Sequence, residues 1–162
     1  DVRIAISGSH SLGKSTLVWD WVKRHPQYRR EEEPFRALDL EMYDIRFRQE
    51  SNRLHNGIQM YYNASRVNLY STISDCVIFD RAPVDLSLIH MTDRWPVGME
   101  DDGIRPVDLA YRSEVDAIFK QIYRNERYSV MPDMNRPKLI ELLGSREERI
   151  KQLEQAITSC TT

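Results

Sequence analysis

Short apolar runs and stretches with helical periodicity alternate along the chain. The runs at residues 2–7 and 76–80 have the composition of parallel strands buried on both faces. Three further segments have weaker strand character: a charged one closed by Pro34, one just before the acidic residues 100–102, and one stopped by Gly144. The strands predicted in this way cover residues 2–7, 28–33, 76–80, 95–99 and 139–143.

Helices are predicted between these strands, because apolar residues recur there at intervals of three and four. The longest covers residues 45–73, and Gly57 is a point at which we expect a break into two helices. Ser113 and Ser145 are predicted to cap helices, the latter in a capping box with Glu148. The other predicted helices follow residue 13 up to Pro26 and cover residues 84–91, 113–123 and the chain from 145 on, with a loop at 124–137.

The first strand leads into the segment Gly-Ser-His-Ser-Leu-Gly-Lys-Ser, which has the spacing of a Walker A sequence. A glycine-permitted loop before a helix N-terminus directs backbone N–H groups at the phosphates of a nucleotide. Lys14 would add positive charge near the β- and γ-phosphates, and the Ser15 hydroxyl would bind Mg²⁺. The predicted nucleotide-binding residues here are Gly8, Ser9, His10, Ser11, Leu12, Gly13, Lys14, Ser15 and Thr16.

The alternation of strands and helices predicts an α/β fold in three layers, a P-loop NTPase fold with a parallel sheet of about five strands. A length of 162 residues fits a single domain over 1–162. In such a fold the catalytic groups lie where the parallel strands end. Asp80 and Arg81 follow one predicted strand, and Glu33 follows another.

These strand ends carry residue types suited to phosphoryl transfer. Asp80 is predicted to hold the hydration shell of Mg²⁺ together with Ser15, and Arg81 to bridge phosphates or pair with a carboxylate. Glu33 is the candidate general base, with Glu31 and Glu32 as alternatives. Helix capping by Asp80 and a solvated acidic run at 31–33 are the plainer interpretations.

Composition narrows the classes of partner. A hydrophobic fraction of 41%, a charged fraction of 30% and a net charge of −2 are ordinary for a globular protein and give no broad field that attracts polyanions. Two cysteines lack the spacing of a metal site, and no apolar run is long enough to span a bilayer. We expect a cytoplasmic protein with a small-molecule substrate and no membrane partner; the oligomeric state stays open, and nucleic acid stays an alternative partner.

Several segments resemble known kinases. Glu33-Pro34-Phe35-Arg36 looks like the Glu-Pro motif of deoxynucleoside kinases, and residues 79–85 resemble the Asp-Arg-Ser motif of thymidylate and deoxynucleoside kinases, with Ala82 in place of the serine. Residues 59–66 are similar to the helix with which deoxynucleoside kinases recognise the base. This resemblance implies that the substrate-binding residues are Arg36, Gln59, Asn63 and Arg66; a merely solvated polar face on that helix is the alternative.

The order of the motifs also resembles the AAA-type ATPase/kinase group related to nicotinamide riboside kinase. Asp102-Gly103-Ile104-Arg105 and the segment at residues 144–149 match its elements. This resemblance implies a lid near 100–124 that brings Arg105 and Arg112 over the phosphates, whereas ordinary surface pairing would explain the same arginines. It also implies that Gly144 and Arg149 flank the base of the donor nucleotide.

Three functions fit these features. The first is Mg²⁺-dependent transfer of the γ-phosphoryl group of ATP or GTP to a nucleoside, nucleotide or related metabolite. The second is a kinase that acts on a polynucleotide end or a modified DNA base, which the acidic balance of the chain disfavours. The third is a P-loop NTPase without a kinase acceptor; the chain is short for a motor, and the guanine-recognising Asn-Lys-x-Asp of switch GTPases is absent.

Overall fold

A small parallel sheet lies at the centre of the computed structural model, which describes residues 2–9, 12–38, 53–73, 76–91, 109–124 and 137–159. Its strands are β1 (Arg3–Ile6), β2 (Arg29–Glu31) and β3 (Val77–Asp80). They run parallel in the order β1-β3-β2, so β3 is the middle strand, and all four of its residues are buried. Three of the predicted strands are therefore confirmed. A sheet of five is not shown, and residues 95–99 lie outside the described residues.

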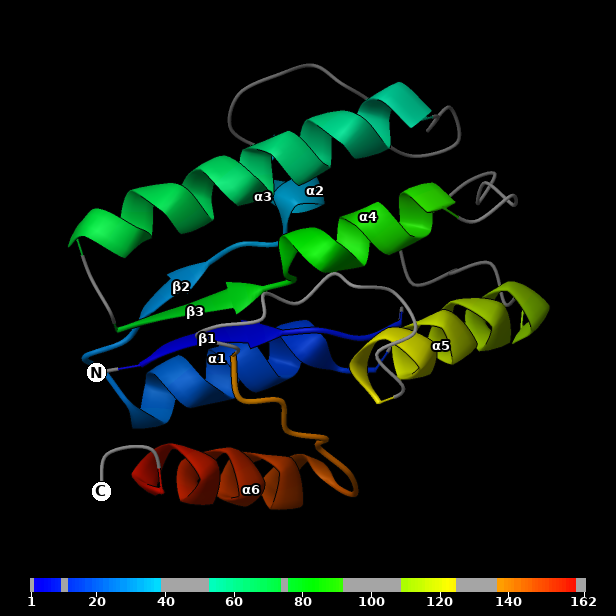
Figure 1. Ribbon diagram of the computed structural model, residues 1–162. Helices are drawn as coiled ribbons and strands as arrows, with labels where there is room; N and C mark the ends of the chain where they lie inside the picture. The colour runs from blue at the N-terminus through cyan, green and yellow to red at the C-terminus, as the bar shows by residue number, and fades with distance from the viewer. Residues whose placement is uncertain are drawn as a thin grey trace.

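Helices cover both faces of this sheet (Figure 1). The helices α1 (Lys14–Arg24) and α6 (Arg146–Thr158) lie on one side, and α3 (Arg53–Ile73) and α4 (Pro83–Met91) lie on the other. The side chains of β3 alternate accordingly: Ile78 belongs to the apolar core with α1 and α6, whereas Val77 and Phe79 pack with Tyr70 of α3. The described residues thus form the α/β arrangement in three layers that the alternation of elements predicts.

Two smaller helices complete the described structure. The short α2 (Pro34–Ala37) directly follows Glu33, where the sequence pattern indicated no helix. The helix α5 (Leu109–Tyr123) packs against Val84 of α4 through Val115, Phe119 and Ile122. It begins before Ser113, which is exposed inside the helix, so the prediction that Ser113 caps it is wrong.

The segment at residues 139–143, predicted as a strand, forms none. Its apolar side chains are largely open to solvent, with exposed fractions of 47% for Leu139 and 61% for Leu143. The Gln152 side chain of α6 bonds to both backbone groups of Leu143, accepting from its N–H at 3.0 Å and donating to its carbonyl at 3.0 Å. A side chain thus takes the place that a neighbouring strand would occupy in a sheet.

The helix α3 continues through Gly57, so the break expected there does not occur. It buries its polar face and exposes apolar residues. Asn56, Gln59 and Asn63 have exposed fractions of 6%, 7% and 3%, whereas Leu54 and Tyr61 have 70% and 78%. A solvated polar face is therefore excluded for these three side chains. None of the described helices combines the length and the apolar character that a bilayer crossing requires.

The predicted capping box at the start of α6 is confirmed. The Ser145 hydroxyl accepts from the backbone N–H of Glu148, and the Glu148 carboxylate accepts from the Ser145 backbone N–H at 2.7 Å. We expect Ser145→Ala to lower the free energy of unfolding by about 1 kcal/mol, because one helix N–H loses its partner. Urea unfolding measures this change, and Ser159→Ala at the other end of the helix is the control. An unchanged stability of Ser145→Ala would contradict a capping role.

Candidate active site

The ends of the three strands meet at one edge of the sheet. In the parallel register Ile6 lies beside Asp80, and Glu31 lies beside Phe79. The chain therefore leaves β1 into the glycine-bounded loop, β3 into Arg81, and β2 into Glu33, all at the same edge. This arrangement brings together the predicted loop, the predicted metal ligand and the predicted base, which are far apart in the sequence.

The glycine-bounded loop has the backbone that its sequence requires. Gly8 and Gly13 have φ angles of +145° and +75°, which residues with a side chain rarely adopt. The Lys14 ammonium donates to the Ser9 carbonyl at 2.6 Å and is buried, so it points into the loop. Thr16 is exposed on the first turn of α1, and His10 and Ser11 lie outside the described residues.

The environment of Lys14 disfavours the charged form of its side chain. Burial, and then the charge of Arg81, lower the pKa of Lys14 to about 7, although Glu33, Asp85 and Asp80 oppose this shift. A phosphate group within the loop would restore the charged form, because an anion close to an ammonium favours its protonation. The loop is therefore suited to a polyphosphate.

Asp80 and Ser15 bring a carboxylate and a hydroxyl group close together. Asp80 is 2% exposed, and burial, followed by the charge of Glu33, raises the pKa of its carboxyl group. The Ser15 hydroxyl lies near this carboxylate and opposes the rise in its pKa, and the Oδ1 atom of Asp80 has no hydrogen-bond partner among the described residues. In the described parts of the chain, no group of three or more His, Cys, Asp or Glu side chains has an arrangement that could hold a metal ion. A carboxylate and a hydroxyl nevertheless fit Mg²⁺, which keeps several waters and takes few protein ligands.

Arg81 and Glu33 form a buried ion pair beside this group. The Arg81 Nε donates to Glu33 Oε1 at 2.7 Å, and the two side chains are 4% and 18% exposed. The backbone of Arg81 has a φ of +93°, an uncommon conformation for a residue with a side chain, and its N–H donates to the Ile6 carbonyl at 3.1 Å. Burial lowers the pKa of Arg81, and the charges of Glu33 and Asp85 raise it above its ordinary value.

A second buried carboxylate lies on the other side of Arg81. Asp85 of α4 is 0% exposed, and its Oδ1 accepts from the Ser7 hydroxyl at 2.6 Å. The Tyr123 hydroxyl of α5 lies 3.0 Å from the Ser7 hydroxyl and 3.4 Å from the same carboxylate oxygen. The Oδ2 atom of Asp85 lies 3.9 Å from Arg81 Nη1 and has no hydrogen-bond partner among the described residues. Asp85 therefore links the start of the glycine-bounded loop, Arg81 and α5.

Burial of Asp85 makes a testable contribution to stability. Burial raises the pKa of Asp85 to about 6, although Arg81, Ser7 and Lys14 oppose this shift. The folded chain therefore binds this proton more tightly than the unfolded chain. We expect the free energy of unfolding of the wild type, relative to Asp85→Asn, to increase by up to about 3 kcal/mol as the pH falls from 7 to 4. Urea unfolding across this range measures the difference, and a constant difference would contradict the shift.

The residues predicted to bind the acceptor lie in two environments. Gln59 and Asn63 are buried on the sheet side of α3, and Asn63 donates to the Arg81 carbonyl at 3.3 Å. Arg66 instead forms two hydrogen bonds to Glu31, at 2.9 and 2.8 Å. Arg36 Nε lies 3.8 Å from Glu33 Oε2. The structure thus brings Asn63 and Arg36 next to the Arg81 and Glu33 pair, and it engages Arg66 with a neighbouring strand.

One of the two predicted donor-base residues, Arg149, contacts the glycine-bounded loop. Arg149 donates to the Gly144 carbonyl at 2.9 Å and to the Leu12 carbonyl at 2.6 Å. Gly144 has a φ of +88°, which agrees with its place in the turn before α6. Arg105 lies outside the described residues, as does the side chain of Arg112 within α5.

The sequence pattern did not identify three members of the site, which are Ser7, Asp85 and Tyr123. Ser7 is the last residue before the first glycine of the loop, and Asp85 is the only carboxylate in the sequence of α4. A single acid in an otherwise largely apolar helix is a signal that could have identified Asp85, because such a group needs a buried partner. Nothing in the sequence distinguishes Tyr123 from other aromatic core residues.

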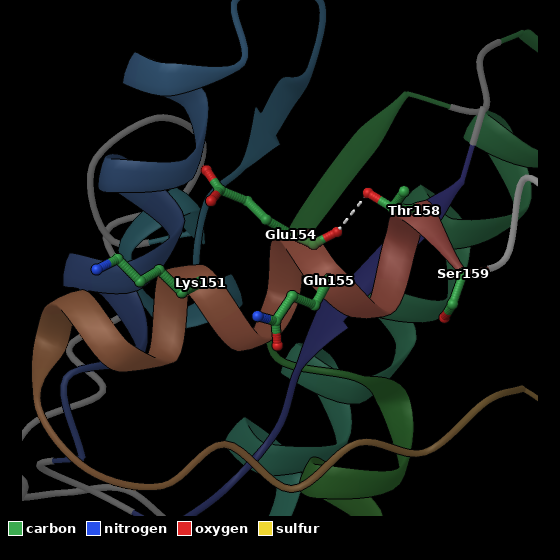
Figure 2. A pocket seen from close by; sticks show the side chains of 5 residues that line it. All are labelled: Lys151, Glu154, Gln155, Thr158 and Ser159. Atoms are coloured by element: carbon green, nitrogen blue, oxygen red, sulfur yellow. Dashed lines mark hydrogen bonds between the residues drawn. The ribbon is translucent and has the colours of Figure 1, made fainter.

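A separate hollow lies on the outer surface of α6 (Figure 2). Its lining mixes one cation, one anion and neutral polar side chains, and it includes none of the predicted site residues. The Thr158 hydroxyl is turned to the Glu154 carbonyl of its own helix at 2.9 Å. The residues that line the hollow are Lys151, Glu154, Gln155, Thr158 and Ser159.

Comparisons with known proteins do not assign the chain to a family. No protein-family model matches the chain, and no curated protein is similar to it. A solved structure described as the crystal structure of NadR protein in complex with NR is similar at 17% identity with a TM-score of 0.42. The likeness covers 99% of this chain and 41% of that chain, so this chain spans less than half of its length. A likeness at that level assigns neither a fold family nor an activity, and the residues of the site carry the argument.

Proposed function

We propose that the protein is a Mg²⁺-dependent phosphotransferase with a P-loop NTPase fold, which moves the γ-phosphoryl group of ATP or GTP to a hydroxyl group of a small acceptor. One observation carries the proposal: the buried Lys14, the pair of Ser15 and Asp80, and the pair of Glu33 and Arg81 meet at one edge of a parallel sheet. Bound Mg²⁺ would neutralise charge on the phosphates.

The roles follow from these positions. The oxygen of the acceptor hydroxyl attacks the γ-phosphorus, the bond to the β–γ bridging oxygen breaks, and the hydroxyl proton passes to Glu33. Lys14 stabilises the charge that develops on the leaving phosphate, and the loop amides fix the phosphates in place. A lid near 100–124 that carries Arg105 and Arg112 remains part of this proposal, as does contact of Gly144 and Arg149 with the donor base.

The pairing of charges favours an uncharged acceptor. Among the described residues at this edge, Arg36 and Arg81 lie against Glu33, and Arg66 is bonded to Glu31. These arginines already have carboxylate partners, so a phosphate on the acceptor would have to displace one of them. A nucleoside or similar polar neutral molecule that bonds to the amides of Gln59 and Asn63 meets no such cost. Nucleotides and polynucleotide ends are therefore disfavoured as acceptors.

Transfer of label from γ-³²P-ATP or γ-³²P-GTP tests the proposal. The acceptor panel contains nucleosides including nicotinamide riboside, their monophosphates, and DNA with free 5′ ends or modified bases. We expect labelled product with a neutral nucleoside and little with a monophosphate. Label that appears only as free phosphate with every acceptor would make the protein an NTPase, and label on DNA would support the polynucleotide alternative.

A further inference from the structure

The Glu33 carboxylate takes part in two interactions, one with arginine side chains and one with the acceptor of the proposed reaction. In the structure it accepts a hydrogen bond from Arg81 Nε at 2.7 Å, and Arg36 Nε lies 3.8 Å from its other oxygen. In the proposed reaction it must also receive a proton from the acceptor. An acceptor hydroxyl that approaches Glu33 therefore competes with a buried guanidinium. Because Arg81 is 3% exposed, it cannot move away from Glu33 without another anionic partner.

Asp85 is placed to be that partner. Its Oδ1 atom is engaged by the Ser7 hydroxyl, whereas its Oδ2 atom is buried, has no hydrogen-bond partner among the described residues, and lies 3.9 Å from Arg81 Nη1. A shift of about 1 Å would bring Nη1 within the distance of a charge-assisted hydrogen bond. A buried carboxylate oxygen without a partner is costly, so this bond would remove a penalty that the present arrangement carries.

Hydrogen bonds hold the Arg81 backbone in place, so only the side chain of Arg81 can move. The Arg81 N–H is bonded to the Ile6 carbonyl at 3.1 Å, and the Arg81 carbonyl accepts from Asn63 at 3.3 Å. The positive φ of +93° at Arg81 is thereby held by β1 and by α3. The guanidinium can consequently turn between two carboxylates while the strand and the helix stay in place.

We propose that Arg81 exchanges partners during the reaction: its guanidinium leaves Glu33 for Asp85 Oδ2 when the acceptor hydroxyl bonds to Glu33. Asp85 is then a positioning residue, which acts on the reaction through Arg81 and touches neither substrate. This inference rests on the proposed function for the event that starts the exchange. The two carboxylates around one buried guanidinium are a property of the chain itself and can be tested without turnover.

The first test uses ¹⁵N NMR of the full chain without substrate. In Glu33→Ala the Arg81 Nε loses its carboxylate, and we expect slowly rotating, hydrogen-bonded Arg81 Nη resonances to appear, assigned by their loss in Glu33→Ala with Arg81→Lys. Adding Asp85→Asn to Glu33→Ala should remove them. Absence of these resonances in Glu33→Ala, or their persistence in the variant that also carries Asp85→Asn, would overturn the exchange. The first of these outcomes does not depend on whether Asp85→Asn folds.

The second test compares two variants around the same carboxylate. We expect Asp85→Asn to lower kcat by about 10–100-fold with KM for the Mg-nucleotide within about threefold of wild type. Tyr123→Phe removes a hydroxyl beside Oδ1 and leaves Oδ2 untouched, so its effect on kcat should be about tenfold smaller. Equal effects would mean that Asp85 only holds the fold together. If the wild type transfers to no acceptor, the proposed function fails while the NMR result stands; if the wild type is active and Asp85→Asn equals it, the exchange alone fails.

Discussion

We expect Lys14→Ala to abolish the proposed phosphoryl transfer, with a loss of about 10²–10³-fold or more in kcat/KM. The Lys14 ammonium lies inside the glycine-bounded loop, 2.6 Å from the Ser9 carbonyl, where the charge of a leaving phosphate would develop. Nothing else on the described loop carries a positive charge. The measurement is transfer of label from γ-³²P-ATP to the best acceptor, with nucleotide affinity determined in parallel by equilibrium binding.

The matched control is Lys23→Ala, which removes an exposed lysine from the same helix. Loss of Lys14 should not unfold the chain, because burial lowers the pKa of Lys14 to about 7 and its charged form is already disfavoured. Urea unfolding of Lys14→Ala should therefore stay within about 1 kcal/mol of the wild type. Retention of full transfer activity in Lys14→Ala would remove the loop from the mechanism, and with it the proposed function.

Features set by short stretches of sequence could be predicted. The apolar run Val77–Asp80 forms the buried middle strand because each of its side chains suits one face of a covered sheet. Gly8 and Gly13 adopt positive φ, and Ser145 caps α6, because these positions depend on local backbone geometry. The meeting of Asp80 and Glu33 at one edge followed from the parallel direction of the strands.

Features set by tertiary contacts could not be predicted. The pattern of α3 suggested an ordinary amphipathic helix, yet Asn56 and Asn63 face inward because they donate to the carbonyls of Leu86 and Arg81, which other parts of the chain bring there. Residues 139–143 have the composition of a strand but form none. Gln152 of α6 supplies hydrogen bonds to the backbone of Leu143 instead of a neighbouring strand. Periodicity describes one segment at a time, and it cannot show which partner a polar side chain will meet.

Asp80→Asn is expected to weaken the binding of Mg²⁺ in the proposed reaction without damaging the fold. The amide keeps the shape of the side chain, but it removes the negative charge that a divalent cation needs. We expect the Mg²⁺ concentration for half-maximal transfer to rise by about 10–100-fold, with kcat at saturating Mg²⁺ also reduced. Titration of the transfer rate with Mg²⁺ at fixed nucleotide measures both effects.

A measurement of stability distinguishes loss of the metal ligand from unfolding of the Asp80→Asn variant. Asp80 is 2% exposed, burial raises the pKa of its carboxyl group, and its Oδ1 has no hydrogen-bond partner among the described residues, so the charge is held at a cost. Asp80→Asn should therefore match the wild type in urea unfolding, or exceed it. The control is Asp116→Asn on α5, whose carboxylate is 38% exposed and paired with Lys120 at 2.6 Å. If the Mg²⁺ titrations of the wild type and Asp80→Asn coincide, Asp80 does not hold the metal.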